Sequence, residues 1–234
     1  EATFQQLVMS EKLASIGEIT AGVAHEINNP VAVIQGNIDV IRTFLGKNAA
    51  DISTELNLID QQVLRIDAIV GKLLQFARPS EFGTFEETSN LGQIVKDSLV
   101  LVNHVILKDG IEIVCDITEC PDVKISSGEL QQVVVNLIMN SLQAMTGQGV
   151  LTISSHPCDR NGIAGASIIV ADTGTGIPPD KIKTVFDPFY TTKLGDGTGL
   201  GLSISQTLIQ TAGGLITVRN LSPVGAAFTV WLPV

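Results

Sequence analysis

His25 is the residue whose surroundings best suit group transfer. Apolar residues recur at steps of three or four from Leu13 through Ile27 to Leu45, which predicts a long amphipathic helix. At about 100° per residue, His25 falls roughly opposite this apolar stripe, where it would face solvent beside the carboxylate of Glu26. An exposed imidazole with an adjacent base has the properties of a nucleophile. A surface histidine on a coiled coil is the alternative.

Two asparagines, Asn136 and Asn140, are spaced for a shared ligand. They lie four residues apart in a predicted helix over residues 129–145, so their side chains project from one face. Amide oxygens are hard ligands suited to Mg²⁺, and they add no negative charge beside a bound phosphate. A satisfied polar pair on an amphipathic helix is the alternative.

Asp172 follows the apolar run of residues 168–171, which predicts a strand, and it precedes Gly174 and Gly176. A carboxylate at a strand end can accept a hydrogen bond from an exocyclic amine. The two glycines would let the backbone approach a ligand closely. This segment taken by itself also matches an ordinary turn.

A second glycine-rich segment, Gly197-Thr198-Gly199-Leu200-Gly201, opens a helix predicted over residues 198–211. The free amides and the dipole at such a helix start favour phosphate. The segment is neither a Walker A loop nor a Rossmann fingerprint. Residues 187–196 lack periodicity and predict a mobile lid, in which Lys193 is the candidate phosphate contact and a solvated lysine the alternative. We expect two aromatic residues to anchor this lid to the sheet, Phe186 and Phe189.

Together and in this order, these segments resemble the kinase core of bacterial sensor histidine kinases. That core is a dimerisation and phosphoacceptor domain followed by a Bergerat-type ATP-binding domain. The run from His25 to Pro30 and the Phe-Tyr-Thr-Thr-Lys run of residues 189–193 are similar to the nitrogen-regulation or dicarboxylate-sensing branch.

The resemblance implies ATP and Mg²⁺ as cofactors, with Mg²⁺ held by Asn140 assisted by Asn136, and the adenine amino group bound by Asp172. It also implies that His25 is phosphorylated, with Glu26 as the base, and passes its phosphoryl group to an aspartate of a response regulator. Asn29, one turn beyond His25, would orient the water that dephosphorylates the regulator.

Two other functions fit parts of the chain. A Bergerat-type ATPase that uses nucleotide as a conformational clamp would resemble residues 89–234 but would lack the His-Glu hairpin. A dimer that only relays or scaffolds is the second, and the intact asparagine, aspartate and glycine segments argue against it.

The predicted fold is a helical hairpin over residues 1–79, a linker over 80–88 and a two-layer α/β sandwich over 89–234. The second apolar stripe of the hairpin, from Ile52 to Ala77, alternates steps of four and three as a heptad seam does. Two such helices cannot fully bury their stripes against each other, whereas two hairpins in a four-helix bundle can. We therefore expect a homodimer.

Composition excludes some functions. The net charge of −10 argues against nucleic-acid binding, because a phosphate backbone would be repelled. The three cysteines lack metal-ligand spacing and fit a reduced cytoplasmic compartment, and Cys115, in an apolar alternation, is expected in the core. No apolar run is long enough to span a membrane. Because the chain opens on Glu1, we expect a fragment that lacks its upstream sensor domain, cut from a protein that the inner membrane could anchor.

Overall fold

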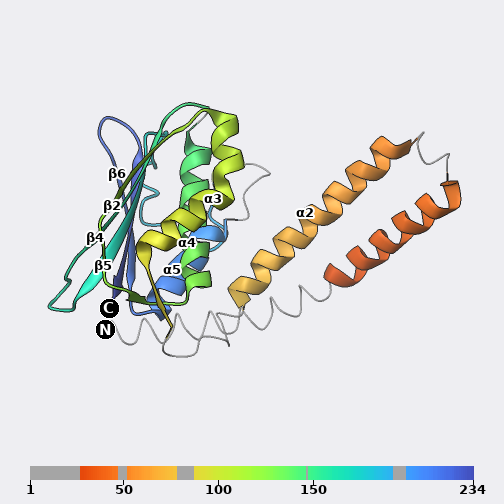
Figure 1. Cartoon of the computed structure of the whole chain (residues 1–234). Coiled ribbons are helices and arrows are strands. Elements are labelled where there is room, and N and C mark those ends of the chain that lie inside the picture. Colours follow the sequence, from red (N-terminus) through yellow and green to blue (C-terminus); the bar gives the residue numbers. More distant parts are fainter. Residues whose placement is uncertain (1–26, 47–51, 78–86, 146, 192–198) are drawn as a thin grey trace. The chain divides into compact units, whose positions relative to one another are not determined.

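The computed structural model describes residues 27–46, 52–77, 87–145, 147–191 and 199–234 (Figure 1). The chain divides into two compact units, Glu1–Pro79 and Ser80–Val234, and each is considered by itself below. None of the described helices is long and apolar enough to cross a membrane.

The first unit contains a helix over residues 27–45 and the helix α2 (Ser53–Ala77). Ile27 and Ile66 pack against the edges of the core between these helices. The core itself takes one residue per heptad from each helix, and none of the four is more than 6% exposed: Val31, Ile38, Leu56 and Val63. The predicted apolar stripes are confirmed for these members.

One flank of this core is polar. Arg42 forms an ion pair with Asp60 and also donates to Asn57 at 3.3 Å. Gln35 donates to the same Asp60 carboxylate at 3.4 Å. Because the Arg42 and Asp60 side chains are 37% and 22% exposed, the pair adds little stability. The pair links facing turns of the two helices.

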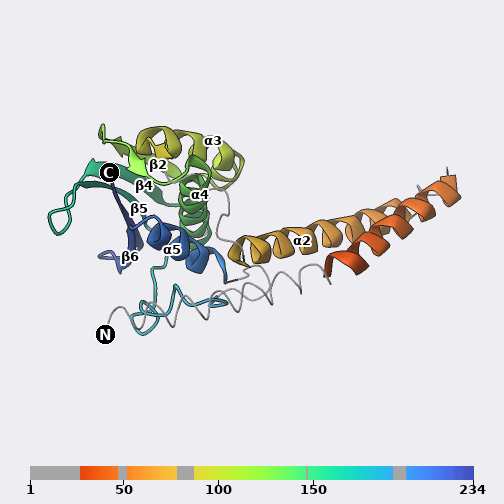
Figure 2. The same cartoon turned by 90° about the horizontal axis from the view of Figure 1, so that it is seen from below.

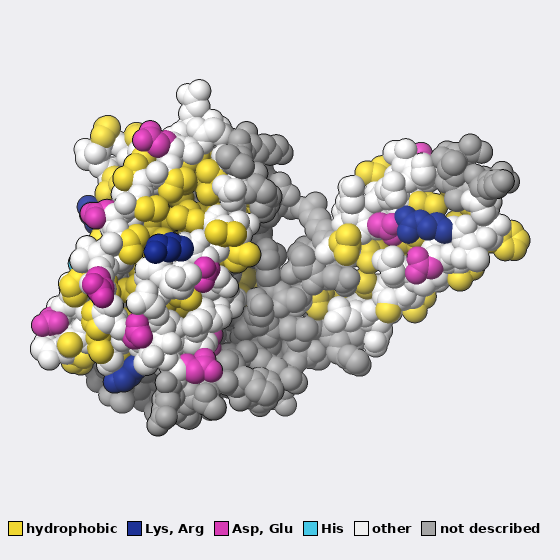
Figure 3. Space-filling model, viewed as in Figure 1, with side chains coloured by type: hydrophobic (Ala, Val, Ile, Leu, Met, Phe, Trp, Pro, Cys, Tyr) yellow, Lys and Arg dark blue, Asp and Glu magenta, His cyan; other side chains and the backbone are white. Residues whose placement is uncertain are grey.

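The other flank is apolar and exposed. Ile34 and Ile41 follow the buried residues Val31 and Ile38 by three, whereas Gln35 and Arg42 follow them by four, so the two sets lie on opposite sides of the core. Ile34, Ile41 and Ile59 are 42–43% exposed, and hydrophobic side chains reach the surface of the hairpin in Figure 3. One hairpin therefore buries only part of its stripes.

The second unit is a mixed sheet with helices on one face. The sheet has the order β2-β4-β5-β7-β6, with β2 parallel to β4 and every other pair antiparallel. Helices α3, α4 and α5 lie on one side of it, as Figure 2 shows. In chain order the elements are β1 (Thr88–Ser89), α3 (Leu91–Asp109), β2 (Glu112–Ile117), β3 (Val123–Lys124), α4 (Ser127–Ala144), β4 (Val150–Pro157), β5 (Gly165–Asp172), α5 (Gly201–Thr211), β6 (Leu215–Asn220) and β7 (Ala226–Pro233). The predicted two-layer α/β architecture is confirmed.

Side-chain caps start two of the helices. Asn90 accepts a hydrogen bond from the Gln93 amide at 3.0 Å, and Ser126 accepts one from the Glu129 amide at 3.4 Å. Helix α3 continues to Asp109, and Ile106 extends its buried face into this last part. The short β1–β3 ladder, two residues on each strand, has no alternation to reveal it.

The core position expected for Cys115 is wrong. Cys115 is exposed on β2, which is an edge strand with mostly exposed side chains. Alternation identifies the face of a strand, but it does not reveal that the strand lies at the sheet edge, where neighbours cover only one side. The local burial that remains raises the pKa of the thiol.

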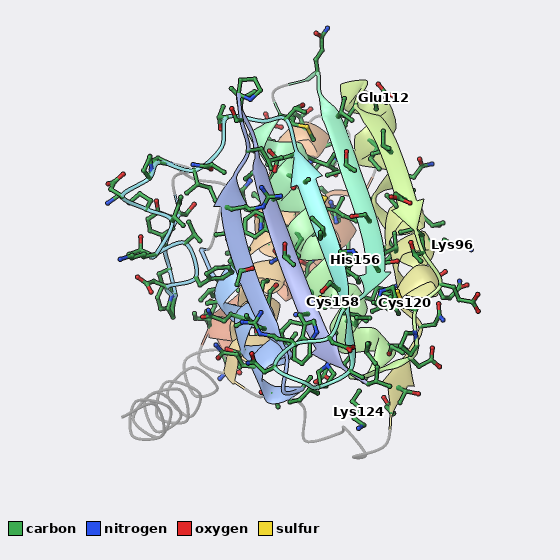
Figure 4. All side chains as sticks on the ribbon, turned by 90° about the vertical axis from the view of Figure 1, so that its left-hand side faces the viewer. Lys96, Glu112, Cys120, Lys124, His156 and Cys158 are labelled. Atoms are coloured by element: carbon green, nitrogen blue, oxygen red, sulfur yellow. The ribbon has the colours of Figure 1, made fainter. Side chains whose placement is uncertain are left out.

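The face of the sheet opposite the helices is viewed in Figure 4, which labels His156 of β4. On the β5–β7 pair, Gly165 lies against Trp231, whose indole Nε1 donates to the carbonyl of Cys158 at 2.8 Å. A Cβ atom at Gly165 would lie 2.6 Å from that Nε1 and 2.5 Å from the carbonyl oxygen of Leu232. Only glycine leaves room for the ring here.

We predict that Gly165→Ala lowers the free energy of unfolding of this unit by about 2–3 kcal/mol, because the methyl group overpacks the site and displaces the indole from its acceptor. Gly128→Ala is the control, since a Cβ there meets nothing within 4 Å. Trp231, the chain's one tryptophan, reports urea unfolding by fluorescence. Equal midpoints for the two variants would contradict the prediction.

Candidate functional site

Asp172 ends β5 with its side chain almost fully buried, at 2% exposure. Its Oδ1 accepts hydrogen bonds from the amide of Gly174 at 2.9 Å and from the amide of Ala226 at 3.3 Å. A buried carboxylate needs such donors. These two bonds fix Asp172 where β5 and β7 meet, at the end of a strand as the sequence predicts.

The glycines after Asp172 are packed against the protein's own backbone. A Cβ at Gly174 would lie 2.6 Å from the carbonyl oxygen of Ala144, which also accepts a hydrogen bond from Thr175 at 3.3 Å. Gly176 has φ +70°, and a Cβ there would lie 3.1 Å from the carbonyl oxygen of Gly225. The small size of both residues therefore lets the loop pass between the end of α4 and the β6–β7 turn.

Asn136 connects α4 to the start of α5. Its Nδ2 donates to Ser205 Oγ at 2.9 Å, and a Cβ added to Gly201 would lie 2.3 Å from its Oδ1. Asn136, Asn140 and Ala144 are spaced by four, so they follow one another along one face of α4. The first contacts the start of α5 and the last contacts the loop after Asp172.

Asn140 lies between these two contacts, one helical turn or about 6 Å from each. Its side chain is half-buried, and its amide forms no hydrogen bond with any other residue that the structure describes. Those same described residues hold no cluster of three or more His, Cys, Asp or Glu that could bind a metal. The Asn140 amide oxygen is a candidate ligand for a hard cation such as Mg²⁺.

Just before α5, the backbone of Gly199 lies against the backbone of Phe189. Gly199 has φ +66°, and a Cβ there would lie 2.4 Å from the carbonyl carbon of Phe189. Leu200, in the N-cap position, is buried and provides no side-chain cap for the first amides of α5, which are therefore candidate phosphate contacts. Lys193 and Gly197 lie outside the described residues.

Of the two expected lid anchors, one is confirmed. The ring of Phe186 packs edge-to-face on that of Phe228 in β7, with the centroids 6.5 Å apart. Phe189 is not an anchor, since its side chain is 60% exposed. At φ +65° its backbone, rather than its ring, makes the contact with Gly199.

His25 and Glu26 lie outside the described residues, whereas Asn29 is exposed near the start of the helix over residues 27–45. Farther along that helix, three apolar residues that do not belong to the buried stripe are strongly exposed: Val33 at 63%, Val40 at 63% and Phe44 at 90%. Asp39, Val40, Thr43 and Phe44 line a shallow hollow of about 510 Å³. The apolar character of Val33, Val40 and Phe44 off the stripe was the available sequence signal, although these residues belong to none of the motifs described above.

Two family models match the chain. Residues 15–81 match HisKA, the His Kinase A (phospho-acceptor) domain, and residues 126–234 match HATPase_c, the histidine kinase-, DNA gyrase B- and HSP90-like ATPase.

Among curated proteins, the chain is 34% identical over 227 residues to the sensor histidine kinase ZraS of Salmonella typhimurium. The aligned region covers 96% of this chain and 47% of ZraS. It is 32% identical over 234 residues to the signal transduction histidine-protein kinase AtoS of Escherichia coli, and the aligned region covers 99% of this chain and 37% of AtoS. The chain thus spans about half or less of these relatives' lengths.

Two solved structures also match the chain. Full-length ShkA in complex with AMPPNP matches with a TM-score of 0.73 and 25% identity, covering 92% of this chain and 45% of ShkA. The histidine kinase ThkA in complex with the response regulator protein TrrA matches with a TM-score of 0.63 and 28% identity, covering 96% and 63%. The chain belongs to the sensor histidine kinases, with a HisKA phospho-acceptor domain followed by a HATPase_c domain.

Proposed function

We propose that this chain transfers the γ-phosphoryl group of ATP to His25 and then to an aspartate of a response regulator. The observation that carries the proposal is the half-buried Asn140 amide between the Gly174 loop and the start of α5, which forms no hydrogen bond with another described residue. This arrangement offers the Asp172 carboxylate to a nucleotide base at one side and the first amides of α5 to phosphates at the other. The match of residues 15–81 to HisKA favours a kinase over a nucleotide-driven clamp.

In the proposed site, Asp172 binds the adenine amino group. Described amide donors engage its Oδ1, and the other carboxylate oxygen would accept the hydrogen bond of the exocyclic amine. The backbone at Gly174 and Gly176 would lie along the base. Phosphates would meet the first turn of α5, around Gly199, Leu200 and Gly201, with Gly197 and Lys193 as further contacts.

Mg²⁺ would be held by Asn140, whose amide is available for it. Asn136 would contribute less, because its amide already donates to Ser205 and packs on Gly201. When bound, the cation would neutralise part of the charge on the phosphate oxygens, which stabilises the departing ADP.

In the phosphoryl transfer, a neutral imidazole nitrogen of His25 attacks the γ-phosphorus, the bond to the β-phosphate oxygen breaks, and ADP leaves. Glu26 would accept the ring proton as the base. Asn29, exposed one turn farther on, would orient the water that hydrolyses the regulator's phosphoaspartate.

Two surfaces of the hairpin fit the proposed partners. The exposed flank with Ile34, Ile41 and Ile59 suits a second copy of the chain, because a four-helix bundle would bury it. Val33 and Val40 lie on the helix that carries Asn29, and they offer an apolar surface for a receiver domain. The likeness to ThkA, solved with a response regulator, supports such a partner.

We propose further that this kinase core acts in the cytoplasm as part of a longer protein with an upstream sensor domain. The incomplete coverage of ZraS and AtoS supports the longer protein.

The proposed function predicts that γ-labelled ATP gives an acid-labile, base-stable label on the wild-type chain and that His25→Gln removes it. Nucleotide binding by His25→Gln, measured by calorimetry, should be unchanged, since the acceptor and the nucleotide site belong to different units. Wild-type ATP binding without such label would favour the nucleotide-clamp alternative, and full labelling of His25→Gln would refute the assigned acceptor.

Asn140→Asp should reduce the labelling of His25 at least 100-fold, because it places a carboxylate within several ångströms of the negatively charged triphosphate. Asn103→Asp adds the same charge at an exposed position of α3 and should label normally. Labelling rates with Mg²⁺·ATP test the pair. A normal rate for Asn140→Asp would show that this amide has only a structural role.

Ile59→Lys should dissociate the expected dimer, because each bundle would bury two like charges, and an unpaired buried charge costs several kcal/mol. Leu58→Lys is the matched control, since its side chain is 54% exposed and follows the buried Leu56 by two, off the seam. Sedimentation at micromolar concentration distinguishes the variants. A monomeric wild-type chain that still phosphorylates itself would rule out the dimer.

A further inference from the structure

We infer that Asn220, the last residue of β6, is a positioning residue that holds the nucleotide-binding loop of residues 172–177 in its binding conformation. The inference rests on the proposed function, because it assigns the loop to ATP. Asn220 belongs to none of the glycine-rich or asparagine-rich segments that the sequence analysis identifies.

The Asn220 side chain binds both backbone groups of one residue of the loop. Its Oδ1 accepts a hydrogen bond from the Ile177 amide at 2.8 Å, and its Nδ2 donates to the Ile177 carbonyl at 2.6 Å. A side-chain amide thus takes the place of a neighbouring strand, which would offer one acceptor and one donor in the same way. Asn220 therefore fixes the end of the loop at Ile177 from a position 43 residues later in the chain.

The beginning of the loop is fixed to the same hairpin. The Ala226 amide, at the start of β7, donates to Asp172, and a Cβ at Gly225 would lie 2.0 Å from the Asp172 carbonyl oxygen. A hydrogen bond of 2.8 Å from the Leu221 amide to the Gly225 carbonyl closes the turn between β6 and β7. Both ends of the loop are therefore attached to one short turn.

The two Asn220 hydrogen bonds also set the path of the loop between its ends. A Cβ at Gly176 would lie 3.2 Å from Asn220 Oδ1, so the amide packs directly on the glycine that adopts φ +70°. Without the two hydrogen bonds, Ile177 could leave this position and the backbone next to the base would lose its fixed course. ATP would then have to order the loop on binding, which lowers affinity.

Asn220 acts through Ile177, so its loss should weaken ATP binding and leave the chemical step intact. We expect Asn220→Ala to raise the Kd for ATP about tenfold, the effect of two lost hydrogen bonds to an ordered loop. The rate of His25 labelling at saturating ATP should stay within about twofold of wild type. The Ile177 amide should exchange its hydrogen faster in the nucleotide-free protein.

Asn220→Asp provides a second variant of nearly the same shape. It keeps the acceptor for the Ile177 amide but places a carboxylate oxygen against the Ile177 carbonyl, so it should also weaken binding. Arg219→Ala is the control, because this neighbour on β6 is exposed and is expected to have no effect on Kd. Because Asn220 is itself exposed, the variants should keep the melting temperature of the nucleotide-free protein within a few degrees.

An unchanged Kd in Asn220→Ala, or a Kd change accompanied by an equal fall in saturated rate and by loss of thermal stability, would overturn the inference. The wild-type chain separates this failure from failure of the proposed function. If the wild type binds and transfers the label but the variants match it, only the role of Asn220 is wrong. If the wild type binds no ATP at all, the proposed function is wrong, and the inference fails with it.

Discussion

The second unit depends on the burial of α4. Five of its residues have no exposed surface at all, namely Leu130, Val133, Val134, Leu137 and Ile138. Burial of this kind, at about 25 cal/mol per Å² of apolar surface, makes the helix a rigid element of the unit. The remaining face carries Asn136, Asn140 and Ala144, against which α5 and the loop after Asp172 pack. A rigid helix therefore sets the spacing of two segments that are far apart in sequence.

Patterns within a few residues predicted the elements and several chemical groups. The position of Asp172 at a strand end and the four-residue spacing of Asn136 and Asn140 depend on neighbours in the chain, and the structure bears out that local geometry. Sequence reasoning failed where the outcome depends on distant neighbours. The exposure of Cys115 follows from the place of β2 in the strand order, and the role of Asn220 follows from a partner 43 residues away.

The hairpin shows the same division between local and distant information. Its apolar stripes reveal which residues avoid water, but a stripe does not state which surface will cover each member. The structure separates them into buried residues such as Val31 and Ile38 and exposed ones such as Ile34 and Ile41. The polar pair of Arg42 and Asp60 marks the flank where a second apolar surface is unsuited, so an apolar partner fits the opposite flank better.

The contact between Phe189 and Gly199 also bears on how such a protein can change during evolution. Because the two residues touch through their backbones, the chain enters and leaves the segment between them at neighbouring points. Position 199 is therefore restricted to glycine, since any side chain there would force the two backbones apart.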